Sequence, residues 1–240
     1  LSPPNLMKTL LAVLACWSSV TLCRLPAQNS VSLNLGAPGE TITDHLIYSN
    51  NGLTATATAW SRPVSGGMFE QSQLAQWSPG IGVKSAGEVI TNIPYVPYYT
   101  DNESYYDFVL FVFDHPVEID RVKIHPSGNL FDLDVSYWLG NVDPSLKLDG
   151  VGFNSLSGLG FGSRMEDDAP VSSAARWVNV NSNTGGINAL LVGARVYGDS
   201  GIDRFKIQTL DVTPAIPEPA AALLLIAAVP LFMRRRVVRS

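Results

Sequence analysis

The sequence predicts an all-β fold: one β-sandwich body of the jelly-roll or immunoglobulin-like kind, residues 28–212, between an N-terminal signal peptide and a single C-terminal transmembrane helix. Three observations predict it. No stretch of the body keeps a helical period beyond about two turns. Strand-length apolar or alternating runs recur instead, separated by Gly, Asn, Pro and Asp. Mostly apolar segments lie near both ends of the chain.

Residues 1–27 are expected to contain an export signal preceded by a few upstream residues. Met7 is followed by Lys8, then by a mostly apolar run from Leu10 to Leu22, and Ala27 is the expected cleavage site. A basic start, an apolar centre and a small residue before polar sequence are typical of secretory signals. The alternative interpretation is an uncleaved anchor or a buried helix.

Both cysteines of the chain, Cys16 and Cys23, fall within this segment, so the exported body would contain none. Disulfide bonds and cysteine-ligated zinc are therefore excluded from the exported protein. A body of this length can bury enough apolar surface to be stable without them.

About eight strands are expected in the body. They are Ile42–Tyr48, Leu53–Trp60, Phe108–Phe113, Val117–Ile119 continued by Val122–Ile124, Asp132–Leu139, Ala174–Asn181, Ala189–Tyr197 and Arg204–Val212. The apolar run Phe108–Phe113 predicts a central strand covered on both faces. The residues expected to face the core are Leu133, Val135, Tyr137, Trp138, Leu139, Trp177, Phe205 and Ile207.

Two irregularities are expected between these strands. Asp120-Arg121 shifts the alternation by one residue, which predicts a β-bulge. His115 precedes Pro116, and this pair predicts a turn.

The charge of the body excludes nucleic acid as a partner. Residues 28–216 contain 10 basic and 20 acidic side chains, and the other six basic residues lie near the two ends of the chain. A body with a net charge of −10 repels a phosphate backbone.

The C-terminus has three parts in a fixed order. A short spacer, residues 213–219, ends in Pro217-Glu218-Pro219, an apolar segment covers residues 220–233, and Arg234, Arg235 and Arg236 begin a basic tail, residues 234–240. The apolar segment is about 21 Å long as a helix, shorter than a bilayer core of about 30 Å, but a bilayer thins locally and arginines reach toward the interface. The basic cluster places the tail in the cytoplasm and the body outside.

This tail resembles the PEP-CTERM sorting signal of Gram-negative bacteria, with Pro217, Glu218 and Pro219 as its signature. The resemblance implies that exosortase, a membrane-embedded cysteine protease, recognises the tail and releases the body from the inner membrane to the cell surface or extracellular matrix. A permanent anchor preceded by a proline-rich linker is the alternative, with the same topology.

Parts of the body also resemble other exosortase-sorted proteins. The similar segments are Gly80–Val83, Asp101-Asn102, Tyr106–Phe111, Asp132–Asp134, Tyr137–Gly140 and Asp203–Ile207. These short motifs imply a shared architecture rather than a shared activity.

Catalysis is not expected. His45, His115 and His125 are the only histidines, and none has the i, i+4 spacing of a zinc-binding helix. The chain also shows no nucleophile elbow and no phosphate-binding loop that opens a helix.

Calcium is the expected ligand if the body binds a metal, because oxygen-rich loops suit a hard cation with six to eight oxygen ligands. The first candidates are Asp101, Asn102 and Asp107, which flank one loop. Two further groups are Asp132 with Asp134 and Asp199 with Asp203. The alternative is that these carboxylates occupy turns and the solvent-facing side of strands.

A carbohydrate platform is the other hypothesis, because aromatic faces accept the apolar faces of sugar rings. Tyr98, Tyr99 and Tyr105 are the candidates, in a tyrosine-rich loop that begins at Tyr95. The sequence therefore predicts a non-enzymatic exported surface protein associated with exopolysaccharide or biofilm. A carbohydrate-binding or adhesion module, calcium-dependent or not, and a secreted hydrolase are the alternatives.

Overall fold

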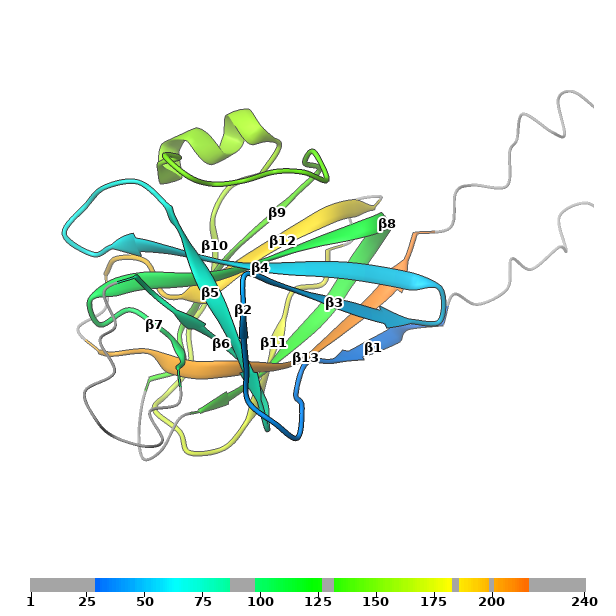
Figure 1. Cartoon of the computed structure of the whole chain (residues 1–240), viewed down its shortest axis with the longest axis horizontal. Helices are drawn as coiled ribbons and strands as arrows, with labels where there is room; N and C mark the ends of the chain where they lie inside the picture. The colour runs from blue at the N-terminus through cyan, green and yellow to red at the C-terminus, as the bar shows by residue number, and fades with distance from the viewer. Residues whose placement is uncertain (1–28, 87–97, 127–131, 183–185, 199–200, 216–240) are drawn as a thin grey trace, which may run out of the picture.

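The structure is a computed structural model, which describes residues 29–86, 98–126, 132–182, 186–198 and 201–215 (Figure 1). In these residues the chain is nearly all β, as predicted: thirteen strands form one hydrogen-bonded sheet, and the 3₁₀ segment η1 (Phe153–Leu159) lies outside it. The predicted signal peptide, transmembrane helix and basic tail fall outside the described residues. Within the described ranges, no helix has the length and apolar character needed to cross a membrane.

The strands follow one path through the sheet, in the order β1-β13-β6-β5-β4-β8-β12-β9-β10, and four further strands branch from it. Their bounds are β1 Val31–Asn34, β2 Thr41–Thr43, β3 His45–Asn50, β4 Leu53–Pro63, β5 Glu70–Trp77, β6 Gly80–Lys84, β7 Thr100–Asp101, β8 Tyr105–Pro126, β9 Val135–Gly140, β10 Met165–Asp167, β11 Arg176–Asn179, β12 Ile187–Ala194 and β13 Arg204–Pro214.

The sheet turns back on itself along β8. The first half of β8 pairs with β4 and β12, and the second half pairs with β13 and β11. The strands predicted between Phe108 and Ile124 are therefore one strand, and the turn predicted at His115-Pro116 is wrong. Proline lacks a backbone N–H but keeps its carbonyl, so it can still accept a hydrogen bond from a neighbouring strand. The Pro116 carbonyl accepts such a bond from the Ala215 N–H, at 2.8 Å.

The predicted β-bulge is confirmed at Asp120. Adjacent residues of β13, Asp211 and Val212, pair with Arg121 and Ile119, so Asp120 is the extra residue of β8 and pairs with no residue in the β13 ladder. Its carbonyl instead accepts hydrogen bonds from the N–H groups of Val180 and Asn181, at 3.1 and 3.0 Å. The extra residue lets the side chains on both sides of the bulge face the core.

Other predicted strands are found with shifted bounds. The strand expected at Ile42–Tyr48 is two strands, β2 and β3, and the strand expected from Asp132 begins only at Val135. β13 ends at Pro214, two residues beyond the predicted end of the body. Sequence patterns did not indicate β1, β5, β6, β7, β10 or η1.

Two clusters of buried side chains hold the sheet together. The larger one includes Val109 and Phe111 of β8 with Leu133, Val135, Phe205 and Ile207. The smaller one lies under η1, on the other side of β8 and β9, and includes Phe108, Leu110 and Trp138. The prediction that the apolar part of β8 is covered on both faces is thus confirmed. Figure 1 shows η1 set apart from the strands, beyond β9 and β12.

Two of the expected core residues are less buried. Leu139 packs on the larger cluster but is only partly buried. Trp177 is half-buried, and the centre of its ring lies 4.0 Å from the guanidinium carbon of Arg121.

Candidate functional site

Three carboxylates from distant parts of the chain meet at one place. Asp132 forms a parallel β-bridge with Asp203 just before β13, and Asp134 precedes β9. One carboxylate oxygen from each of the three lies within 4.8 Å of the others. Asp203 is fully buried and Asp134 is 6% exposed, so these groups are not the solvent-facing side of a strand.

Hydrogen bonds hold the cluster in place. The Asn102 side-chain amide donates to Asp203 Oδ2 at 2.7 Å and accepts from the Asp203 N–H at 2.8 Å. The Asp134 N–H donates to Asp203 Oδ1 at 2.8 Å, and the Leu133 N–H donates to Asp132 Oδ1 at 2.9 Å. The cluster is therefore preorganised by the backbone as well as by side chains.

The electrostatics of the cluster favour a cation. Burial raises the pKa of Asp134, and the nearby carboxylates of Asp132 and Asp168 raise it further, against hydrogen bonds from the Ala169 N–H and Arg195 that lower it. Arg195 lies 3.1 Å from Asp134 and also pairs with Asp168. Carboxylates this close repel one another strongly where water is excluded, and a bound cation would relieve that repulsion.

The donor set fits a hard cation. Carboxylate and amide oxygens are the ligands that Ca²⁺ prefers, and aspartates with one asparagine supply only such atoms. The cluster contains no nitrogen or sulfur ligand, which argues against zinc. Asp132, Asp134 and Asp203 would hold the ion, with Asn102 keeping Asp203 in place.

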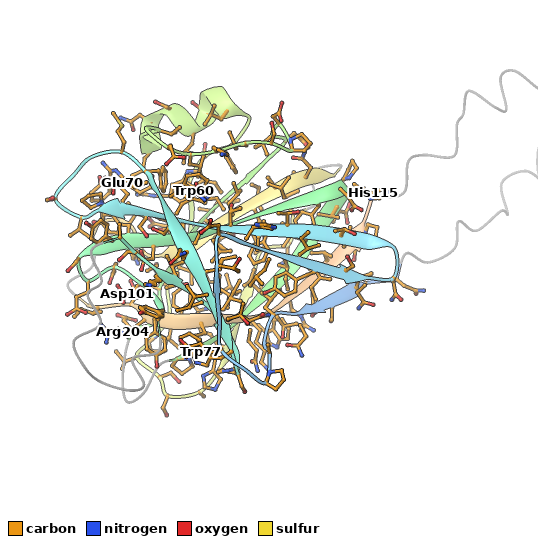
Figure 2. The ribbon with its side chains drawn as sticks, in the orientation of Figure 1. Trp60, Glu70, Trp77, Asp101, His115 and Arg204 are labelled. Atoms are coloured by element: carbon orange, nitrogen blue, oxygen red, sulfur yellow. The ribbon has the colours of Figure 1, made fainter. Side chains whose placement is uncertain are left out.

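The residues first predicted to bind calcium do not gather at one point. Asp107 is buried on β8, where it accepts a 2.6 Å hydrogen bond from the Ser61 hydroxyl. Asp101 lies 3.5 Å from Arg204 and accepts a hydrogen bond from the Glu103 N–H, and burial raises its pKa (Figure 2). Only Asn102 joins the cluster. Asp199 lies outside the described residues.

The tyrosines predicted to form a sugar platform contact the protein itself. Tyr98 is 3% exposed and meets Trp77 edge-on, with 6.4 Å between ring centroids, so neither face is open to a sugar. Tyr99 is half-buried, and its ring lies 5.3 Å from Lys206 Nζ. Tyr105 is half-buried at the start of β8, and Tyr95 lies outside the described residues.

Lys206 completes this aromatic group. Its Nζ lies 3.3 Å from the centroid of the Trp77 ring, and the residue is only 3% exposed. Burial lowers the pKa of Lys206 to about 7, although the Glu40 carboxylate acts in the opposite direction.

An exposed aromatic residue that sequence patterns did not indicate follows β12. Tyr197 is 51% exposed and has a φ of +63°. Its hydroxyl accepts a 2.9 Å hydrogen bond from Arg62 Nη1.

The histidines lie apart from these groups. His115 lies on the surface and pairs with the carboxylate of its neighbour Asp114 at 2.7 Å. Figure 2 labels it, at the right of the view, away from Asp101 and Arg204. His125 Nδ1 lies 2.9 Å from the carbonyl oxygen of Pro126, and His45 is exposed on β3. No family model matches the chain, and a search of curated proteins finds no match either.

Proposed function

We propose that this chain is a non-enzymatic protein of the bacterial cell surface, exported and sorted by exosortase, whose β-sandwich body of the jelly-roll or immunoglobulin-like kind binds calcium. The observation that carries the calcium proposal is the meeting of Asp132, Asp134 and Asp203 within 4.8 Å. The observation that carries the sorting proposal is the order of the three parts of the C-terminal sequence.

The body supports this role by its composition and its pairing. Its stability does not depend on an oxidised or reduced environment, because it contains no cysteine. β8 pairs with strands on both halves of the bent sheet, which fits a sandwich in which one strand crosses from layer to layer. A body with this extensive strand pairing suits a role in the extracellular matrix, associated with exopolysaccharide.

Calcium is expected to stabilise the folded protein, because an ion that binds only the native state shifts the equilibrium toward it. At a concentration about 100 times the dissociation constant, the free energy of unfolding rises by about 2.7 kcal/mol. For a body of this size that corresponds to a rise in melting temperature of about 5–10 °C. Differential scanning calorimetry in EDTA and in millimolar CaCl₂ measures the shift.

The Asp203→Asn variant should lose this shift. The matched control is Asp143→Asn, since Asp143 is an exposed loop carboxylate that accepts hydrogen bonds from the N–H and hydroxyl of Ser145 in its own turn. A melting temperature of the unaltered protein that calcium does not move would disprove the calcium site.

Sorting predicts that the tail is removed. When the chain is expressed with an exosortase, the mature protein should lose the residues after the Pro217 region and leave the membrane fraction. Replacing Arg234, Arg235 and Arg236 with glutamine should impair its orientation in the membrane, because positive residues hold the tail on the cytoplasmic side. Mass spectrometry of the mature protein measures whether the tail has been removed. An intact tail would disprove sorting by exosortase and favour a permanent membrane anchor.

A further inference from the structure

Arg62, Arg164 and Tyr197 form a patch, called here the Arg62–Tyr197 patch, in which Arg164 and Tyr197 are exposed and Arg62 is half-buried. Arg62 lies near the end of β4, Tyr197 follows β12, and Arg164 directly precedes β10. The guanidinium carbon of Arg164 lies 5.9 Å from the centre of the Tyr197 ring. Three separate segments thus place two cations beside one exposed aromatic ring.

Arg62 lacks the partner that the other arginines have. Of the six arginines in the described ranges, five have a carboxylate within ion-pair distance and Arg62 has none. Its Nε donates to the Gly67 carbonyl at 2.7 Å and its Nη1 donates to the Tyr197 hydroxyl. In a body with a net charge of −10, an arginine without a carboxylate is available to an external anion.

The guanidinium is also held rigidly. It lies 4.3 Å above the centre of the Phe153 ring, and Phe153 stacks on Trp138 at 5.5 Å with the rings inclined by only 13°. An arginine fixed in this way loses little conformational freedom when it binds a planar anion.

The ring of Tyr197 is presented at a cost in backbone energy. A φ of +63° is uncommon for a residue other than glycine, asparagine or aspartate, and such conformations concentrate at functional sites. The ring is fixed by edge contacts with Tyr106 at 5.5 Å and Phe153 at 6.3 Å, yet it remains half exposed. Its exposed surface is therefore a preformed place for a flat apolar face.

We propose that the Arg62–Tyr197 patch binds an acidic sugar residue, with its carboxylate on Arg62 and its pyranose ring on Tyr197. A guanidinium fork matches a carboxylate, and an aromatic ring accepts the C–H face of a sugar. Arg164 adds positive charge at the edge, although its Nε is already 3.0 Å from Glu166. The inference deepens the proposed surface role, because it names a carboxylated polysaccharide as the matrix component that the body binds.

Isothermal titration of the purified protein with short oligomers of galacturonic acid, in low salt and EDTA, tests the proposal. The acidic oligomers should bind at least about tenfold more tightly than neutral glucose oligomers of the same length, and salt should weaken the binding. EDTA removes calcium and so separates this test from the calcium site. If the acidic oligomers do not bind but calcium still raises the melting temperature, only the patch is disproved.

Two variants should weaken binding about tenfold or more. Arg62→Gln removes the cation, and Tyr197→Asn removes the ring while asparagine still tolerates the positive φ. The matched control is Arg121→Gln, since Arg121 also lies over an aromatic ring, Trp177, but already pairs with Asp211.

The control variant should bind the acidic oligomers as the unaltered protein does. Circular dichroism checks that each variant is folded, and if Arg62→Gln does not fold, Tyr197→Asn carries the test alone. Equal affinity for acidic and neutral oligomers, absence of binding, or unchanged affinity in the Tyr197→Asn variant would each overturn the proposal.

Discussion

Replacing Gly193 with alanine should destabilise the protein by about 3 kcal/mol, because the added methyl group has no room. A Cβ at this position would lie 2.1 Å from the carbonyl oxygen of Asp107 and 2.4 Å from the ring of Phe108. Both neighbours lie on β8, and Phe108 is fully buried. β12 would therefore have to move away from β8 at the centre of the sheet. Chemical denaturation measures the change, which corresponds to a fall of about 6–12 °C in melting temperature.

The matched control is Gly158→Ala. Gly158 lies in η1, and a Cβ there would have no heavy atom within 4 Å. This variant should change the free energy of unfolding by less than about 0.5 kcal/mol. If both variants had equal stability, β12 and β8 would not approach as closely as the structure shows.

Replacing Lys206 with methionine should stabilise the protein by about 2 kcal/mol near pH 6, and the gain should shrink as the pH rises to 9. Burial holds the pKa of Lys206 at about 7 in the folded state, below its ordinary value of 10.5. Between these values the unfolded chain binds more protons than the folded one, so stability rises with pH. Below pH 7 the buried ammonium lowers stability by a constant amount, and methionine of similar shape removes that cost.

The size of this effect is limited by the aromatic ring beside the amine. Between pH 7 and pH 9, the difference in bound protons changes the free energy of unfolding by about 2.7 kcal/mol. The attraction between the Lys206 ammonium and the Trp77 ring offsets part of this change. Urea titrations of both proteins at pH 6, 7, 8 and 9 measure the difference.

Tyr48 does not disturb this measurement. Burial raises its pKa, so its ionisation affects stability only near pH 10 and above.

Lys123→Met is the control for this experiment. Lys123 is also half-buried in a strand, with its Nζ 5.6 Å from the Trp177 ring, but it is not enclosed as Lys206 is. Its replacement should change stability by less than about 0.5 kcal/mol at every pH. A Lys206→Met effect that stayed constant from pH 6 to 9 would show that the amine does not titrate in this range.

Local alternation predicted much of the sheet, because side chains on a strand point to opposite faces with a period of two. It predicts the bulge at Asp120 and the inward positions of Phe205 and Ile207 without any knowledge of their partners in the sheet. It failed at Pro116, where the usual effect of proline is overridden by pairing with Ala215. Such pairing joins segments far apart in sequence and leaves no local pattern.

The candidate metal site was predicted in pieces. The sequence predicts an oxygen ligand at each of Asn102, Asp134 and Asp203, but in different groups. Their proximity depends on the β-bridge between Asp132 and Asp203 and on the loop that carries Asn102. Spacing along the chain contains no information on such contacts, and it grouped Asp107 with Asn102 although Asp107 binds Ser61.

Tyr197 was missed for a related reason. In sequence it ends an apolar strand, where a tyrosine is ordinary, and Gly198 after it is the only hint of an unusual backbone. The exposure of its ring and the unpaired charge of Arg62 become visible only when the ends of β4 and β12 are placed together.

β13 also determines how the body would respond to mechanical force. It pairs with β1 on one side, from Thr209 to Val212, and with β8 on the other, where the pairing continues to Pro214. A pull on the chain beyond residue 214 runs along this strand and loads its hydrogen bonds in shear, many at once, rather than opening them one after another. A body pulled by the chain beyond residue 214 would therefore resist unfolding through a strand that is paired on both sides.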